Sequence, residues 1–263
     1  MAEETNMSFL QHLEELRWRL VRSAIAVIIF GTVIWFYQEK IMNEIFLKMV
    51  NKDFITFKLL CKFFGVCVGD IPVKMQSMTV SGQFSYALML SVMGGVVLAF
   101  PFIFYQIWSF VKPGLKFTEK KMASGIVFYV SFLFFLGIAF GYFVVAPLSI
   151  QFFGTFTMSS QIENIFTINS YMSTVISTVF YTGLFFLLPI VSYFLTKIGL
   201  FDAAFLITYR KHAIVAILVL AAIITPPDVL SQVIVSIPIL ILYEVGIYVA
   251  KRVEKNQRNE NKS

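Results

Sequence analysis

Residues 12–38 read HLEELRWRLVRSAIAVIIFGTVIWFYQ, a short charged stretch that runs directly into a long apolar one. Glu14 and Glu15 stand at the edge of the apolar part, beside Arg17 and Arg19. Arginines are common at the boundary of a lipid bilayer, whereas carboxylates held there are costly unless a positive group meets them. The stretch therefore predicts a membrane-spanning helix with acids at its boundary that need a positive partner.

Composition places the chain among membrane proteins. Of its 263 residues, 58% are hydrophobic and only 14% are charged, which is far from the composition of a soluble domain. The net charge of +6 needs no nucleic acid, because lysines and arginines that flank apolar segments account for most of it. No Walker loop, zinc-spaced Cys/His set or catalytic motif is present. We therefore expect no enzyme, no cofactor, no metal and no nucleic-acid partner.

Six apolar segments predict an all-α polytopic membrane protein, because a segment in lipid must satisfy its backbone polar groups internally. They form one transmembrane domain over residues 1–250, with spans at about 21–38, 78–110, 122–147, 168–196, 212–226 and 229–250. The polar tail, residues 251–263, is expected to be disordered.

The lengths of the segments also predict a shape. The fifth segment offers about 14 residues before Pro226, or about 21 Å of helix, against roughly 30 Å of hydrocarbon. Such a short helix must thin the bilayer, tilt its neighbours or extend its polar ends toward water. Bends are expected at Pro101, Pro147, Pro189 and Pro238. We therefore expect a bent, concave bundle.

The distribution of Lys and Arg predicts the orientation. With six spans both termini lie on one side, which carries three basic residues in 1–22, four in 109–121, three in 197–211 and five after Ala250. These sum to fifteen of the 21 Lys and Arg, and the other six lie between Lys40 and Lys74. The positive-inside rule then puts both termini in the cytoplasm.

Two acids on this cytoplasmic side are the main functional candidates, and each has a simpler alternative. Glu15 can pair with Arg19 along the helix surface, which is worth only about 0.3–0.5 kcal/mol. Glu119 can act as a first-turn acid behind a Thr118 cap. With Phe110 nearby, however, two carboxylates can also clasp a pair of guanidinium groups, since Arg matches carboxylate in a bidentate way.

Other polar residues are weaker candidates. Asp228 most simply caps the sixth span, and Tyr142 can pair with a neighbouring helix. Glu244 lies inside the sixth span, and acids within a membrane are functional candidates by default. Cys61 and Cys67 fall in a connection expected to face outward, where either a disulfide or two reduced thiols fit the spacing.

Four blocks of sequence resemble the TatC family, the receptor subunit of the twin-arginine protein translocase. The blocks are His12-Leu-Glu-Glu-Leu-Arg-Trp-Arg-Leu20, Phe110-Val-Lys-Pro-Gly-Leu-Lys-Phe-Thr-Glu119, Phe140-Gly-Tyr-Phe-Val-Val-Ala-Pro147 and Ile224-Thr-Pro-Pro-Asp-Val-Leu-Ser-Gln232, the last followed by Tyr243-Glu-Val-Gly. They occur in the family's order, and the resemblance covers nearly the whole chain.

The resemblance implies six helices in a cupped shape with short fifth and sixth spans, in the bacterial cytoplasmic (inner) membrane. It implies recognition of Arg-Arg signal peptides at the cytoplasmic face and export of folded proteins, driven by the proton motive force. TatA/TatB-type single-span partners and a homo-oligomeric receptor complex are implied as well. By motif position, the contacts to the signal would come from Glu15, Glu119, Phe110, Arg17 and Arg19. Tyr142, Asp228 and Glu244 match further family positions.

Two departures from the family and one alternative class remain open. Leu187 stands where many relatives carry Glu or Gln, and no proline occurs before Pro72, so contacts with partners can differ at both places. The alternative is a proton- or ion-coupled small-solute transporter that uses Asp228 and Glu244. Against it, the sequence shows no run of acids along one path.

Overall fold

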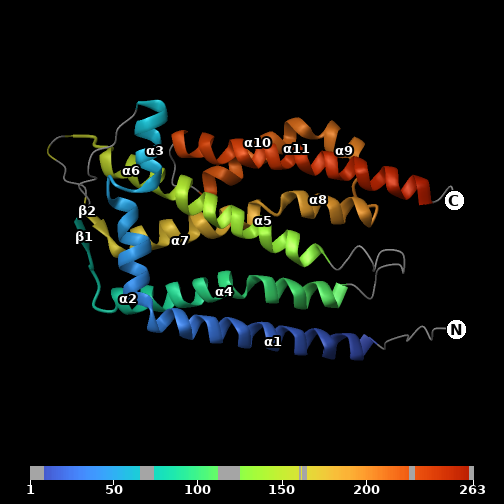
Figure 1. Ribbon diagram of the computed structural model, residues 1–263, viewed down its shortest axis with the longest axis horizontal. Coiled ribbons are helices and arrows are strands. Elements are labelled where there is room, and N and C mark those ends of the chain that lie inside the picture. Colours follow the sequence, from blue (N-terminus) through green and yellow to red (C-terminus); the bar gives the residue numbers. More distant parts are fainter. Residues whose placement is uncertain are drawn as a thin grey trace. The chain divides into compact units, whose positions relative to one another are not determined.

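The computed structural model describes residues 9–65, 74–111, 125–159, 161, 165–224 and 229–260, and within these ranges the chain is mostly helical (Figure 1). The helices are α1 (Phe9–Phe36), α2 (Gln38–Ile41), the π-helix η1 (Met42–Phe46), the 3₁₀-helix η2 (Leu47–Val50), α3 (Ile55–Phe64), α4 (Gly82–Val111), α5 (Ile126–Phe140), the π-helix η6 (Gly141–Val145), α6 (Ala146–Thr155), α7 (Ile168–Phe185), α8 (Leu188–Lys197), α9 (Ala203–Thr208), α10 (Arg210–Ile224) and α11 (Val229–Glu260). Two three-residue strands, β1 (Lys74–Gln76) and β2 (Ile165–Thr167), complete the set.

Four stretches of helix in the described ranges are long and apolar enough to cross a membrane. They are His12–Phe36, Gly82–Val111, Ile126–Thr155 and Ile168–Lys197, which correspond to the first four expected spans. The predicted membrane character is thus confirmed. Helices α10 and α11 overlap the fifth and sixth apolar segments, and their crossing of a membrane stays a prediction.

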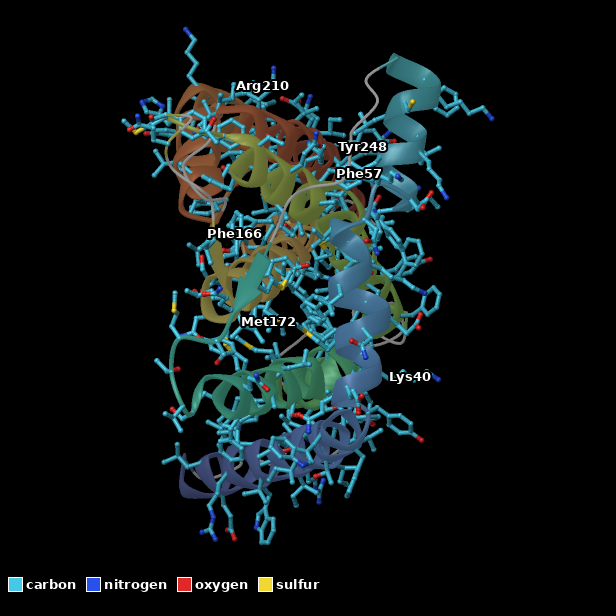
Figure 2. The ribbon with its side chains drawn as sticks, turned by 90° about the vertical axis from the view of Figure 1, so that its left-hand side faces the viewer. Lys40, Phe57, Phe166, Met172, Arg210 and Tyr248 are labelled. Atoms are coloured by element: carbon cyan, nitrogen blue, oxygen red, sulfur yellow. The ribbon has the colours of Figure 1, made fainter. Side chains whose placement is uncertain are left out.

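The chain divides into two compact units. Unit 1 comprises Met1–Ile41 and Phe84–Phe132, and unit 2 comprises Met42–Gln83 and Leu133–Ser263. In unit 1, α1 and α4 run side by side (Figures 1 and 2). Unit 2 contains most of the remaining helices and the two-stranded sheet, in which β1 and β2 pair in parallel with Met75 opposite Phe166.

Glycines let α1 and α4 approach closely in unit 1. A Cβ atom on Gly95 would lie 2.7 Å from the carbonyl oxygen of Val27 and 2.9 Å from the nitrogen of Gly31. A Cβ atom on Gly31 would lie 3.1 Å from the carbonyl oxygen of Ser91. Helices in lipid associate through such close backbone packing rather than through burial of apolar surface. The α1–α4 pair therefore depends on residues without side chains at this crossing.

Unit 2 has a similar close contact and an apolar core. A Cβ atom on Gly137 would lie 2.8 Å from the Cα of Gly183 and 2.8 Å from the Cβ of Phe186, so α5 and α7 approach closely there. Helix α11 packs along α8 and α10. Phe57 and Met172, labelled in Figure 2, are each 2% exposed. The central cluster of this core comprises Val145, Ile217, Ala221, Val235 and Ile239.

The observed helices differ from the expected spans where prolines occur. Helix α4 continues through Pro101. Pro147 and Pro189 lie in the first turns of α6 and α8. Because η6 runs directly into α6, the carbonyl of Phe143 lacks an N–H donor from Pro147, and it accepts from the Thr56 hydroxyl instead. The third expected span continues to Thr155, and the fourth is interrupted between Phe185 and Leu188. Helix α3 and the β1–β2 pair were not predicted, because such short elements have no long apolar period.

The expectation of a disordered tail was wrong for residues 251–260. Helix α11 continues to Glu260. Val253 is buried, and a carboxylate oxygen of Glu254 accepts a hydrogen bond from the backbone N–H of Ala203 at the start of α9. That N–H belongs to the first turn of a helix and has no partner within it. The tail is ordered here because it caps and packs against α9.

Substitution at Gly95 should destabilise the protein, whereas the same substitution at Gly94 should not. In Gly95→Ala the new methyl group meets backbone atoms that cannot move aside, so the helices must separate at a cost of roughly 1–3 kcal/mol. In Gly94→Ala it meets the flexible Cδ1 end of Ile34. Thermal unfolding of the purified protein in detergent measures both. Equal melting temperatures for the two variants would contradict the close α1–α4 crossing.

Candidate functional site

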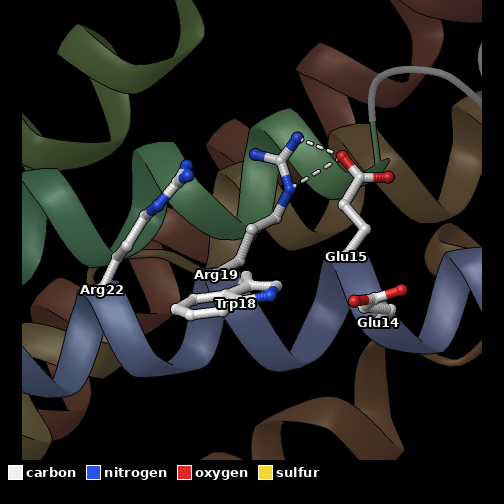
Figure 3. Close-up of a pocket in the computed structure, with 5 residues that line it drawn as sticks. All are labelled: Glu14, Glu15, Trp18, Arg19 and Arg22. Carbon is white, nitrogen blue, oxygen red and sulfur yellow. Dashed lines mark hydrogen bonds and ion pairs between the residues drawn. The ribbon is translucent and has the colours of Figure 1, made fainter.

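The charged end of α1 carries an open pocket of about 570 Å³. Among the described residues, its lining consists of Glu14, Glu15, Trp18, Arg19 and Arg22 (Figure 3). These positions recur at intervals of three and four, so they share one face of the helix. The pocket thus combines two acids, two arginines and an indole ring on one helix.

The centre of the pocket is an ion pair between Glu15 and Arg19. The Nε atom of Arg19 donates to Oε1 of Glu15 at 3.0 Å, and its Nη2 atom donates to the same oxygen (Figure 3). The two side chains are 26% and 20% exposed. This is the pairing along the helix that the sequence left open as an alternative, and it is present in the structure.

Arg19 also reaches the neighbouring helix. Its Nη1 atom donates to the backbone carbonyl oxygen of Gln106 on α4 at 3.4 Å. The guanidinium group therefore has acceptors on both α1 and α4. A planar fork with five N–H groups allows several such contacts at once.

The second carboxylate oxygen of Glu15 is in a different situation. Oε2 is buried, and it has no hydrogen-bond partner among the residues that the structure describes. A buried acceptor without a donor costs roughly 1–3 kcal/mol. The site therefore favours any ligand that brings an N–H donor to this oxygen, and a cationic donor most of all.

Phe110 and Arg17 flank the same end of α1. The ring of Phe110, from the last turn of α4, stacks on His12 with the centroids 4.2 Å apart and the planes inclined by 23°. His12 precedes Glu15 by three residues, so Phe110 lies beside the first turns of the site helix. The guanidinium of Arg17 lies 5.8 Å from the centroid of the Trp18 ring.

Three predicted site residues, Glu119, Asp228 and Cys67, lie outside the described residues, and their roles stay predictions. Cys61 lies on α3 and is disulfide-bonded. Within the described residues, no group of three or more His, Cys, Asp or Glu is arranged to hold a metal ion.

Tyr142 has a structural explanation within unit 2. Its hydroxyl donates to the backbone carbonyl of Ile45 at 2.8 Å, and its ring packs edge-to-face against Phe54 and Phe143. In the reverse direction, Thr56 donates to the backbone carbonyl of Phe143. The accepting carbonyls belong to the π-helices η1 and η6, whose wider turns alter the regular hydrogen-bond ladder. Tyr142 thus joins two irregular segments.

Glu244 is paired as well. Its carboxylate lies 2.8 Å from Nη2 of Arg210, and the two side chains are 51% and 46% exposed. The pair links α11 to α10. An acid whose charge is already met by an arginine is a poor candidate for carrying protons or ions, which weakens the transporter alternative.

Two residues of these sites were not predicted from the sequence, namely Arg22 in the pocket and Arg210 as the partner of Glu244. Arg22 follows Glu15 by seven positions, or two helical turns, so helical spacing alone places both on one face. The partnership of Arg210 with Glu244 bridges 34 positions. No local spacing could have indicated it.

Comparisons with known proteins agree with one another. The family model described as Sec-independent protein translocase protein (TatC) matches residues 11–238. The chain is 38% identical to the TatC protein of Blattabacterium sp. subsp. Periplaneta americana, covering 97% of this chain and 99% of the relative. It is 34% identical to that of Carboxydothermus hydrogenoformans, with 97% of each chain covered.

A solved structure is also similar to this chain. The crystal structure of a twin-arginine translocase receptor, TatC, superposes with a TM-score of 0.71 at 30% sequence identity. The match covers 92% of this chain and 99% of the other. The helices described above therefore follow the fold of that receptor over most of their length.

The pair formed by Arg210 and Glu244 should contribute little to stability if water reaches it. We expect a coupling free energy of about 0.2–1 kcal/mol from a double-mutant cycle with Arg210→Gln and Glu244→Gln. Unfolding the wild type, the two single variants and the double variant in detergent gives the four free energies of unfolding that the cycle needs. A coupling above roughly 3 kcal/mol would show that the pair is shielded from water.

Proposed function

Because this chain belongs to the TatC family of Sec-independent protein translocase proteins, we propose that it is the receptor subunit that binds twin-arginine signal peptides. Membership of the family and the apolar helices establish a component of a protein translocase in a membrane. The observation that supports the receptor role is the half-buried Glu15 carboxylate, whose Oε2 has no partner among the described residues.

The chemistry of the site suits a guanidinium ligand. Glu15 and Glu119 each accept one arginine of the signal, and a hydrogen bond between charged groups is worth roughly 1.5–3 kcal/mol. Arginine offers a planar fork that matches both oxygens of a carboxylate, whereas lysine offers a point charge. The site therefore distinguishes Arg-Arg from Lys-Lys. Phe110, stacked on His12, supplies an apolar wall for the residues beside the arginines.

The proposed setting is the bacterial cytoplasmic membrane. Six spans form a cupped bundle, and their even number puts both termini on the same side of the membrane. That side carries fifteen of the 21 basic residues, which makes it the cytoplasmic side by the positive-inside rule. The signal meets Glu15 at the membrane surface, and its apolar part then enters among the helices. The bound receptor recruits TatA/TatB-type partners, acts as a homo-oligomer, and uses the proton motive force to pass folded cargo. Leu187 leaves an apolar contact where many relatives offer a polar one.

Removal of either carboxylate should weaken recognition of the signal peptide. We expect Glu15→Gln and Glu119→Gln each to weaken the binding of an Arg-Arg signal peptide at least tenfold, since each loses about 1.4 kcal/mol or more. Glu15→Ala and Glu119→Ala should abolish export of an Arg-Arg reporter while the protein still inserts into the membrane. Binding to the protein in nanodiscs and export in cells are the two measurements.

The matched control is Glu14→Gln, which removes the same charge from the same pocket wall. It should keep at least half of the wild-type affinity. Normal export by the Glu15→Ala, Glu119→Ala double variant would contradict the proposed function. So would equal affinity of the wild-type protein for Arg-Arg and Lys-Lys peptides.

The orientation has its own test. In a background with Cys61→Ser and Cys67→Ser, a membrane-impermeant maleimide added to intact spheroplasts should label Ser159→Cys, since residues 148–167 are expected to face outward. It should label Ser263→Cys only after lysis. The reverse pattern would refute cytoplasmic termini.

A further inference from the structure

We propose that Arg19 is a built-in competitor for the arginines of the signal, occupying Glu15 until cargo displaces it. The proposal rests on the function proposed above and concerns the strength of binding at the same site. A residue that contacts the signal directly would raise the affinity for cargo. In this proposal Arg19 lowers that affinity.

The geometry of the ion pair is the first argument. Both Nε and Nη2 of Arg19 donate to Oε1 of Glu15, while Oε2 has no partner among the described residues. A guanidinium that binds a carboxylate through two parallel hydrogen bonds needs both oxygens. An incoming arginine therefore cannot form this arrangement while Arg19 holds Oε1. Displacement of Arg19 is a necessary step in bidentate recognition.

The surroundings of Arg19 make this displacement inexpensive. Its Nη1 atom already contacts the carbonyl oxygen of Gln106 at 3.4 Å. When Arg19 releases Glu15, it keeps this acceptor on α4 and does not lose every partner. The exchange replaces one guanidinium by another on the same carboxylate, so the net gain is smaller than for an empty site. A receptor that must later release its cargo benefits from such a limited affinity.

Arg22 supplies the matched comparison. It lines the same pocket and carries the same charge, but it lies two helical turns beyond Glu15. Figure 3 shows the guanidinium of Arg22 apart from the two dashed contacts that join Arg19 to Glu15. Removing Arg22 changes the local charge without freeing the carboxylate. Any difference in peptide affinity between the Arg19 and Arg22 variants therefore measures the competition between Arg19 and the signal for Glu15.

The experiment measures the affinity of a synthetic Arg-Arg signal peptide for the full-length protein in nanodiscs by fluorescence anisotropy. We expect Arg19→Gln to bind the peptide roughly fivefold more tightly than the wild type, because Glu15 is then free. Arg22→Gln, which removes the same charge from the pocket without freeing Glu15, should produce a smaller gain in affinity than Arg19→Gln. Arg19→Lys should fall between Arg19→Gln and the wild type, since an ammonium group is a weaker competitor than a guanidinium.

A double-mutant cycle tests whether the effect acts through Glu15. In a Glu15→Gln background, Arg19→Gln should produce no more gain than Arg22→Gln does. Melting temperatures of all variants show that the comparison is between folded proteins. Weaker binding in Arg19→Gln, or a gain equal to that of Arg22→Gln, overturns the proposal. If Glu15→Gln alone leaves binding intact, it is the receptor function that fails.

Discussion

Helices surrounded by lipid gain little from hiding apolar side chains from one another, so close van der Waals packing must hold them together. In this protein the packing depends on glycines at the crossings. Gly31 and Gly95 bring α1 against α4, and Gly137 and Gly183 bring α5 against α7. The site follows from the first crossing, because the same pair of helices places Arg19 within reach of the Gln106 carbonyl and Phe110 beside His12.

A second constraint is the satisfaction of backbone groups where helices are irregular. The π-helices η1 and η6 expose carbonyl groups that side chains of other segments satisfy. Tyr142 and Tyr171 donate to the carbonyls of Ile45 and Phe46, and Thr56 donates to that of Phe143. A buried carbonyl that is left without a donor costs roughly 1–3 kcal/mol. These three side chains thus have a structural role before any functional role is considered.

The sequence predicts the long helices well and the connections between them poorly. Apolar length locates the stretches that begin near His12, Gly82, Ile126 and Ile168, because their physical cause is local. Helix α3 and the three-residue strands carry no comparable signal. The prediction of a disordered tail was wrong for residues 251–260, because polar composition says nothing of the contact between Glu254 and Ala203, which joins residues far apart in the sequence.

The candidate site was partly predictable for the same reason. Helical spacing gave the pairing of Glu15 with Arg19, but it could not show that both donors share one oxygen. That detail depends on where α4 offers a second acceptor to the guanidinium. The partner of Glu244 could not be predicted from the sequence either, since Arg210 lies on another helix.

Helix α11 extends ten residues beyond Ala250, which corresponds to about 15 Å of rigid rod. Glu254 joins this part of α11 to the start of α9 through its hydrogen bond with Ala203. A fluorophore attached near Glu260 would therefore reorient together with α11 and not independently of it. Polarised emission or distance measurements from that point would then report the tilt of the last helix itself.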